Sequence, residues 1–125
     1  MDRQKALDAA LNGLLKQDAY SSYRDSCRYR DNHGNKCAVG MLIDDDYYSP
    51  TFEGVSASNA RVLKAIECSL ETEIHEGDEY FLCIMQRELH DNPVRRSDDF
   101  NRELVIRGAW WVANKYGLEV NIEGE

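Results

Sequence analysis

The sequence predicts a mainly α-helical protein, a compact bundle of four to five helices with one loop-rich corner. Apolar residues recur at spacings of three and four over several long stretches, which is the pattern of amphipathic helices. Asn, Ser, Asp and Gly stand where these stretches begin and end, as helix caps do. With 125 residues and 42% apolar content, the chain is long enough for a single helical domain, residues 1–125, to bury its own core.

The amino-terminal half is expected to hold one long helix and then the corner. The helix is predicted over residues 2–18, because these apolar residues share one face: Ala6, Leu7, Ala10, Leu11, Leu14 and Leu15. Residues 20–36 lack this periodicity and are expected to form an exposed loop. The apolar run 37–43 suits a buried strand or a short buried helix, and its good helix formers favour the helix. Gly40 in this run would let a neighbouring segment approach closely.

Two further helices are predicted after an ordered loop over residues 47–58. The first begins at Ser58 or Asn59 and runs to about residue 73, with these residues inward: Val62, Leu63, Ile66 and Leu70. The second begins at Asp78 or Glu79, with these residues inward: Phe81, Leu82, Ile84, Met85 and Leu89. It is expected to end at Asn92–Pro93, because proline opposes continuation of a helix.

The last helix is predicted to begin at Ser97–Asp98 and to end at Gly117. The apolar residues that run along it to this stop are Phe100, Leu104, Val105, Ala109, Trp111, Val112 and Tyr116. More than half of its circumference is apolar, so it is either the central helix of the bundle, which we favour, or partly a contact surface. That width leaves monomer and dimer open. The tail, residues 118–122, alternates with period two and is compatible with one short strand.

The charge balance limits the classes of partner. The net charge of −8 and the pI near 4.9 argue against general nucleic-acid binding, which depends on Lys and Arg. The chain begins without a signal-peptide pattern and contains no apolar run of about 20 residues, so we expect no membrane partner and a cytoplasmic location. The four cysteines are therefore expected to be reduced.

Residues 24–54 form the most distinctive stretch, because arginines, tyrosines and acidic residues surround the apolar run there. The candidate binding residues are Tyr23, Arg28, Tyr29, Arg30, Lys36, Tyr47, Tyr48 and Glu53. The cations make a local positive patch on an acidic protein, which could receive a phosphate-bearing ligand or an acidic protein surface. The alternative is that they pair with Asp25, Asp31 and the acidic run 44–46 within the same corner.

Cysteine chemistry has one candidate nucleophile. Cys37 would start the short helix, whose amino-terminal partial charge would lower the pKa of a thiol. His33, or His90 followed by Asp91, could serve as the base. Because no oxyanion loop or nucleophile signature is present, we expect a buried thiol and assign no catalytic residue.

Metal binding is weighed in the same way. Cys27 and His33 lie near the candidate nucleophile, and the pairs Cys68/His75 and Cys83/His90 repeat a seven-residue gap, which would place each pair on one face of an unbroken helix. Close pairs such as C-x-x-C are absent, and the acidic run lacks the spacing of an EF-hand. We therefore predict no metal or cofactor. Cys68 and Cys83 are expected in the core, and His75 and His90 at helix ends.

The segment GNKCAVGMLIDDDYYSPTFEG resembles a pattern in small uncharacterised proteins of tailed bacteriophages and their bacterial hosts, C-x-x-G-x-L-I-P-D-x-x-Y-x-P-x-x-E. The matching residues are Cys37, Gly40, Leu42, Ile43, Asp45, Tyr48, Pro50 and Glu53. Asp44 stands where the family tends to have proline. The segments FLCIMQRELHD and WWVANKYGL are similar as well. The resemblance implies a phage-related accessory protein and no particular chemistry.

Two functions follow from these observations. In the first, the protein binds a host protein as an adaptor or inhibitor, through the corner and the Trp110–Trp111 face of the last helix, since Tyr, Trp and Arg dominate interfaces. In the second, the corner binds or hydrolyses a small anionic, nucleotide-like ligand with the help of Cys37. The first is favoured, because the chain has no glycine-rich phosphate loop and no complete catalytic set.

Overall fold

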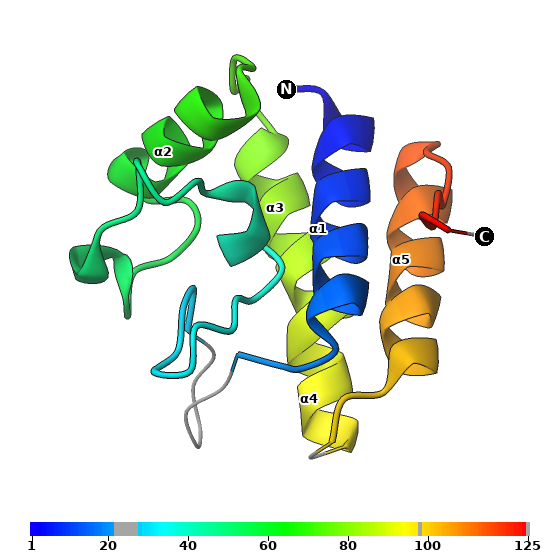
Figure 1. The fold of residues 1–125 in the computed structure, drawn as a ribbon. Coiled ribbons are helices and arrows are strands. Elements are labelled where there is room, and N and C mark those ends of the chain that lie inside the picture. Colours follow the sequence, from blue (N-terminus) through cyan, green and yellow to red (C-terminus); the bar gives the residue numbers. More distant parts are fainter. Residues whose placement is uncertain (22–27, 98, 125) are drawn as a thin grey trace.

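A computed structural model describes residues 1–21, 28–97 and 99–124. Its described elements are the helices α1 (Arg3–Gln17), α2 (Ala60–Leu70), α3 (Asp78–Gln86), α4 (Asn92–Arg96) and α5 (Arg102–Tyr116), the 3₁₀ turns η1 (Gly40–Leu42) and η2 (Pro50–Phe52), and the π-helix η3 (Arg87–Asp91). The prediction of a compact, mainly α-helical fold is confirmed. In Figure 1, α1 lies between α3 and α5, while α2 and the corner lie on the side opposite to α5.

Helix α1 forms the centre of the core. Its six predicted inward residues are all buried, which confirms the predicted face. The Asp2 carboxylate accepts a hydrogen bond from the Lys5 N–H at 3.0 Å and caps the first turn. Asp18 ends the helix in the left-handed conformation with φ 55°. Helix α1 contacts η1, α3 and α5 and lies between α3 and α5 in Figure 1, so it takes the central place that the sequence suggested for the last helix.

Asp78 joins the start of α3 to the start of α1. Its buried carboxylate accepts hydrogen bonds from the Arg3 side chain at 2.9 Å, the amino group of Met1 at 2.9 Å and the His75 N–H at 2.8 Å. Burial alone would raise the pKa of Asp78, but these hydrogen bonds outweigh it and lower the pKa. The Arg3 guanidinium also lies 5.4 Å from the centre of the Phe81 ring. The acidic amino-terminal turn of α3 is therefore fixed against α1.

Helical structure continues through Pro93, and the prediction that it would stop there is wrong. Helix α3 passes into η3 and then α4, which ends only at Arg96. Proline lacks an N–H and its ring clashes with the carbonyl four residues earlier. In the wider π turn the Asn92 N–H donates to the carbonyl five residues back, that of Arg87. The π turn thus sets Pro93 at the first positions of α4, where an absent N–H is tolerated.

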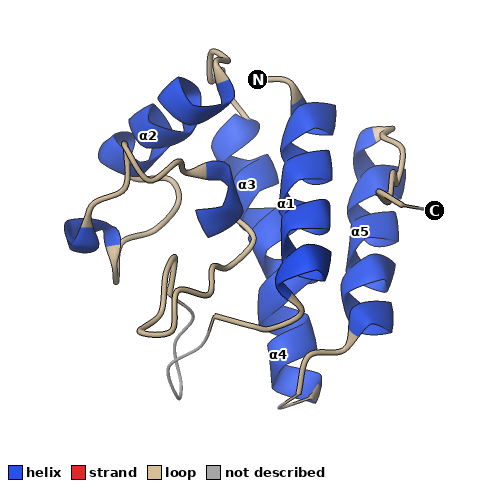
Figure 2. Cartoon of the chain, in the orientation of Figure 1, coloured by secondary structure: helices blue, strands red, loops and turns tan. Residues whose placement is uncertain are grey.

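Helix α5 begins later than predicted and lies at the edge of the bundle (Figure 2). Asn101 caps it by accepting a hydrogen bond from the Leu104 N–H at 3.1 Å, and Gly117 ends it with φ 68°, as predicted. The buried residues of α5 are mostly small: Val105, Gly108, Ala109, Val112 and Ala113. Trp110 and Trp111 are exposed. A face of small residues packs the helix closely and leaves the large indoles outside.

The run 37–43 folds as turns around the single 3₁₀ turn η1, so the predicted short helix is only partly formed. Gly40 permits the close approach that the sequence predicted: a Cβ there would overlap the carbonyl oxygen of Tyr29. The Val39 N–H donates to the side-chain oxygen of Gln86 at 2.9 Å, and the Gln86 amide donates to the Asp91 carboxylate at 2.9 Å. The corner is thereby anchored to η3.

The tail over residues 118–122 is extended but forms no strand among the described residues. Its backbone pairs with side chains of α1. Gln4 exchanges two hydrogen bonds with the backbone of Glu119 at 2.8 and 2.9 Å, and Asn12 accepts from the Glu123 N–H at 2.8 Å and donates to the Asn121 carbonyl at 2.9 Å. The alternating apolar residues of the tail pack against the core. Along the described chain, no helix combines the length and the apolar character needed to cross a membrane.

Candidate functional site

One carboxylate, that of Glu53, organises the loop-rich corner. Its side chain is 11% exposed. One oxygen accepts a hydrogen bond from the Tyr29 N–H at 3.0 Å, and the other accepts from the Arg30 N–H at 3.1 Å and the Tyr48 hydroxyl at 2.6 Å. Arg28 Nε lies 3.8 Å from the first oxygen. Four of the predicted binding residues therefore converge on a fifth.

The cations of the corner have acidic partners inside it. Arg30 forms an ion pair of 2.6 Å with Asp45, donates to the Ile43 carbonyl at 2.8 Å, and lies 4.3 Å above the centre of the Tyr48 ring. Lys36 Nζ is 3.8 Å from the same Asp45 carboxylate. For Arg30 and Lys36 the structure thus matches the internal-pairing alternative.

The tyrosines of the corner act as hydrogen-bond donors. Burial, with the hydrogen bond to Glu53 as a smaller cause, raises the pKa of Tyr48 to about 12. Burial also raises the pKa of Tyr29, whose hydroxyl donates to the Val55 carbonyl. Tyr47 is exposed, and Tyr23 lies outside the described residues. Internal hydrogen bonds and ion pairs hold the described part of the corner together, with Arg30 Nε left buried and without a hydrogen-bond partner there.

Cys37 does not have the environment of a nucleophile. Only 2% of the residue is exposed, and burial raises the pKa of the thiol to about 12, although the Gly40 N–H donates to Sγ at 3.3 Å. The expected buried thiol is confirmed. The lowered pKa that a catalytic Cys37 would need is absent, because burial dominates and η1 is only one short turn. His33 is exposed in a turn where Asp31 accepts from its N–H at 2.9 Å.

His90 is fully buried within η3. Its Nδ1 lies 3.3 Å from the Asp91 carboxylate, and its ring meets the Tyr20 ring edge-on with centres 5.6 Å apart. Its Nε2 has no hydrogen-bond partner in the described part of the chain. A base must reach its substrate, so this imidazole serves packing between η3 and the segment before the corner.

The predicted cysteine–histidine pairs are not formed on shared helix faces. Helix α2 ends at Leu70, before His75, and Cys83 is exposed whereas His90 is buried. The expectation that Cys83 belongs to the core and that His90 ends a helix is therefore wrong. Cys27 lies outside the described residues. Among those that the structure does describe, no three His, Cys, Asp or Glu side chains gather where a metal ion could be held.

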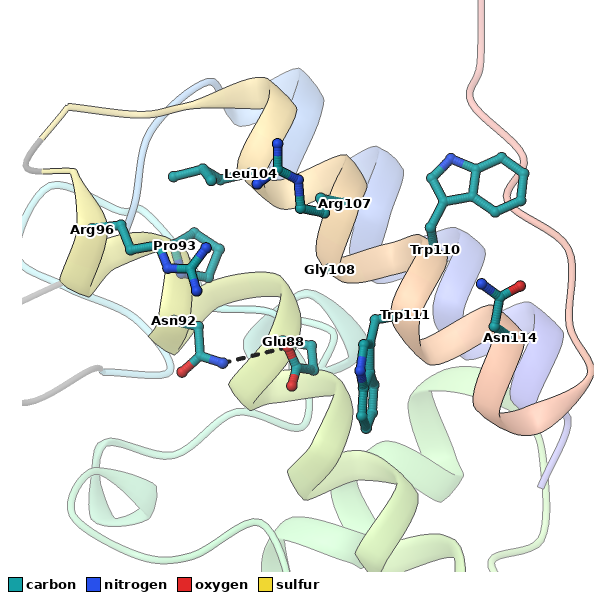
Figure 3. A pocket seen from close by; sticks show the side chains of 10 residues that line it. All are labelled: Glu88, Asn92, Pro93, Arg96, Leu104, Arg107, Gly108, Trp110, Trp111 and Asn114. Atoms are coloured by element: carbon teal, nitrogen blue, oxygen red, sulfur yellow. Dashed lines mark hydrogen bonds between the residues drawn. The ribbon is translucent and has the colours of Figure 1, made fainter.

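A groove of about 500 Å³, here called the α5 groove, lies between α5 and the η3–α4 segment (Figure 3). On the side of η3 and α4 it is lined by Glu88, Asn92, Pro93 and Arg96. On the side of α5 it is lined by Leu104, Arg107, Gly108, Trp110, Trp111 and Asn114. Figure 3 shows the Trp111 ring standing beside Glu88, while the Trp110 ring points away from the other labelled side chains.

The two indoles on α5 are exposed, with 52% of Trp110 and 44% of Trp111 open to solvent. Arg87 and Lys115 each place a cationic group 5.6 Å from the centre of the Trp111 ring. The sequence signalled this surface only by its adjacent tryptophans. The groove itself was missed, because it depends on η3 continuing into α4 beyond Pro93.

The corner and α5, which forms one wall of the α5 groove, lie on opposite sides of α1 in Figure 1. In the corner the described charged side chains largely satisfy one another, whereas the groove presents large aromatic surface to solvent. We therefore take the α5 groove as the candidate site. Comparison of the chain with models of protein families, with curated proteins and with solved structures returned no match.

Proposed function

We propose that the protein acts by binding another protein through the exposed face of α5. The carrying observation is the pair Trp110 and Trp111, both about half exposed beside the α5 groove. Tryptophan is among the residues that contribute most to protein interfaces, and large exposed aromatic surface is uncommon where nothing binds. The corner is not included in this surface, since its described cations pair internally.

The biological setting belongs to the same proposal. The resemblance of residues 37–53 to proteins of tailed bacteriophages suggests an accessory protein that works in the bacterial cytoplasm. There it would occupy a host protein as an adaptor or an inhibitor, including one that counters a host defence. The nucleotide-like ligand and hydrolysis at Cys37 receive no support from a thiol with a pKa of about 12.

Affinity capture from a bacterial lysate with paired variants tests the proposal. The wild-type chain and Tyr80→Ala should retain the same stoichiometric protein, and Trp110→Ala/Trp111→Ala should lose it. Tyr80 is the matched control, because it is an aromatic residue 59% exposed on α3, away from the groove. Circular dichroism and melting temperature establish that each variant is folded. Equal retention by the double tryptophan variant would refute the proposed surface.

A further inference from the structure

We infer that the α5 groove takes an acidic segment of the partner protein, with carboxylates bound by Arg96 and Arg107 and a large apolar side chain packed between Leu104 and Trp111. This inference rests on the proposed function and adds the chemistry of the bound segment.

The groove has unused cationic donors. Arg96 of α4 and Arg107 of α5 are exposed on its two sides. Within the described chain neither guanidinium group forms an ion pair, a hydrogen bond or a ring contact. An arginine presents a planar fork of N–H donors that matches a carboxylate. The two sides of the groove can therefore each hold one acidic side chain.

Glu88 is the only acidic residue among the described residues that line the groove. Glu88 forms an ion pair with Arg87 at 3.1 Å and accepts a hydrogen bond from Asn92 at 3.3 Å. Its charge is thus already balanced on the side of η3. The positive charge of Arg96 and Arg107 remains for a ligand.

Charge is unevenly distributed along the chain. Residues 87–115 contain six of the fifteen Lys and Arg residues but only five of the 23 acidic ones, so this segment is net positive in a chain of net charge −8. A short acidic peptide is attracted to such a local region. A long polyanion such as nucleic acid is disfavoured, because the rest of the molecule repels it.

Part of the groove is apolar. Pro93 is buried, Leu104 is half-buried and the Trp111 ring stands upright at the edge. A volume of about 500 Å³ suits a few side chains and their backbone. The ligand is therefore expected to be a short segment with Asp or Glu beside Leu, Ile or Phe.

The test uses a pool of random synthetic twelve-residue peptides, incubated with the folded full-length chain and identified by mass spectrometry. Wild type should enrich peptides that place Asp or Glu next to a large apolar residue. Arg96→Glu/Arg107→Glu should weaken the binding of a selected peptide by about a hundredfold, since each lost charged contact costs roughly tenfold in affinity. Arg95→Glu/Lys64→Glu makes the same change in net charge at exposed positions that do not line the groove, and should stay within about twofold of wild type.

Several results would overturn the inference. In the peptide experiment these are enrichment of neutral or basic peptides, equal weakening by the control variant, and tighter binding of a twelve-nucleotide oligothymidylate than of any peptide. Self-association lost only in Arg96→Glu/Arg107→Glu would overturn it in favour of a second copy of the chain. The two proposals separate in the lysate capture. Loss in the tryptophan variant with retention in Arg96→Glu/Arg107→Glu would refute the inference alone.

Discussion

At the residue scale, Glu53 stands out because one side chain serves several segments of the corner. Its two oxygens bind two consecutive backbone N–H groups and a tyrosine hydroxyl. Hydrogen bonds to an ionised group contribute about 1.5–3 kcal/mol each, more than bonds between neutral groups. The turn over residues 50–53 holds Glu53 in position, since Ser49 caps it by accepting from the Thr51 N–H.

Replacing Glu53 should therefore destabilise the fold far more than replacing an exposed acid of the same corner. Glu53→Gln removes the charge and turns an NH₂ group toward donors, so we expect a loss of about 2–3 kcal/mol in the free energy of unfolding. Asp45→Asn, at a side chain 81% exposed, should cost less than about 1 kcal/mol. Urea unfolding of both variants measures the difference, and equal costs would show that Glu53 is not the organising group.

The four cysteines should differ in reactivity according to their surroundings. At pH 8 a thiol with a pKa of about 12, as in Cys37, is ionised in about one molecule in ten thousand. Cys83 is exposed and should be alkylated by iodoacetamide long before Cys37, which should react only as the protein unfolds. Peptide mass spectrometry over time follows each site. Rapid native labelling of Cys37 would contradict the buried thiol.

The residues that the sequence predicted well are those with a local reason. Gly40 is a glycine within an apolar run, so the sequence predicted that another backbone segment would pack closely against it, as Tyr29 does. The burial of Cys37 was also expected, because cysteine is often buried and the chain carries no nucleophile signature around it. The internal pairing of Arg30 was one of two alternatives, and only the fold brings Asp45 to it.

At the scale of elements, the contact between α5 and η3 determines how the groove is built. The carbonyl of Glu88 is the one to which residue 93 would donate in a π-helix, and Pro93 has no N–H. Gly108 places its Cα against this oxygen, because a Cβ there would overlap it. A glycine on one helix thus accommodates the backbone irregularity of another.

Two glycines inside helices give a matched test of that contact. Gly108→Ala meets backbone atoms, so α5 and η3 must separate, and we expect a loss of about 3 kcal/mol or more in stability. Gly13→Ala in α1 meets Met41 Sδ at 2.6 Å, and this flexible side chain can move. Since alanine also favours helix by about 1 kcal/mol, Gly13→Ala should stay within about 1 kcal/mol of wild type. Similar thermal unfolding of the two variants would exclude the tight contact.

Elements whose hydrophobic spacing and caps lie within one continuous segment were predictable, and α1 is an example. Its buried face follows from spacing alone. Residue type predicted the cap of α2 as Ser58 or Asn59, and Asn59 is the one that accepts from the Arg61 N–H. The continuation through Pro93 was not predictable, since a π turn leaves no trace in hydrophobic periodicity. The favoured place of α5 at the centre of the bundle was wrong, because its wide apolar surface includes two indoles that stay exposed, while its buried residues are mostly small.

At the scale of the whole molecule, buried phenols make stability sensitive to alkaline pH. Burial raises the pKa of Tyr20, Tyr29, Tyr48 and Tyr116 above the ordinary value of 10.0. The folded chain therefore holds these protons more tightly than the unfolded chain does. Their contribution to stability is complete below pH 10 and is lost as the pH rises from 10 toward the folded pKa, about 12 for Tyr48.

We expect the free energy of unfolding to fall steadily above pH 10. Denaturant unfolding at a series of pH values, with absorbance at 295 nm to follow tyrosinate, measures this. Tyr48→Phe should lower stability at pH 8 by about 1–2 kcal/mol and make the decline above pH 10 shallower. A stability that is flat from pH 9 to 11.5 would contradict the raised pKa values.

Side chains of α1 bind the tail at regular intervals that match along the two segments. Gln4, Asp8 and Asn12 are spaced by four residues, or about 6 Å along a helix, which nearly matches the roughly 6.6 Å between alternate residues of an extended chain. Because the tail contributes mainly backbone groups, side chains at positions 119 and 123 are free to drift. Distant descendants should instead keep amides or acids at 4, 8 and 12 together with apolar residues at 118, 120 and 122. Substitutions in residues 4–12 and 118–122 should then co-vary, although more than a hundred codons separate the two segments.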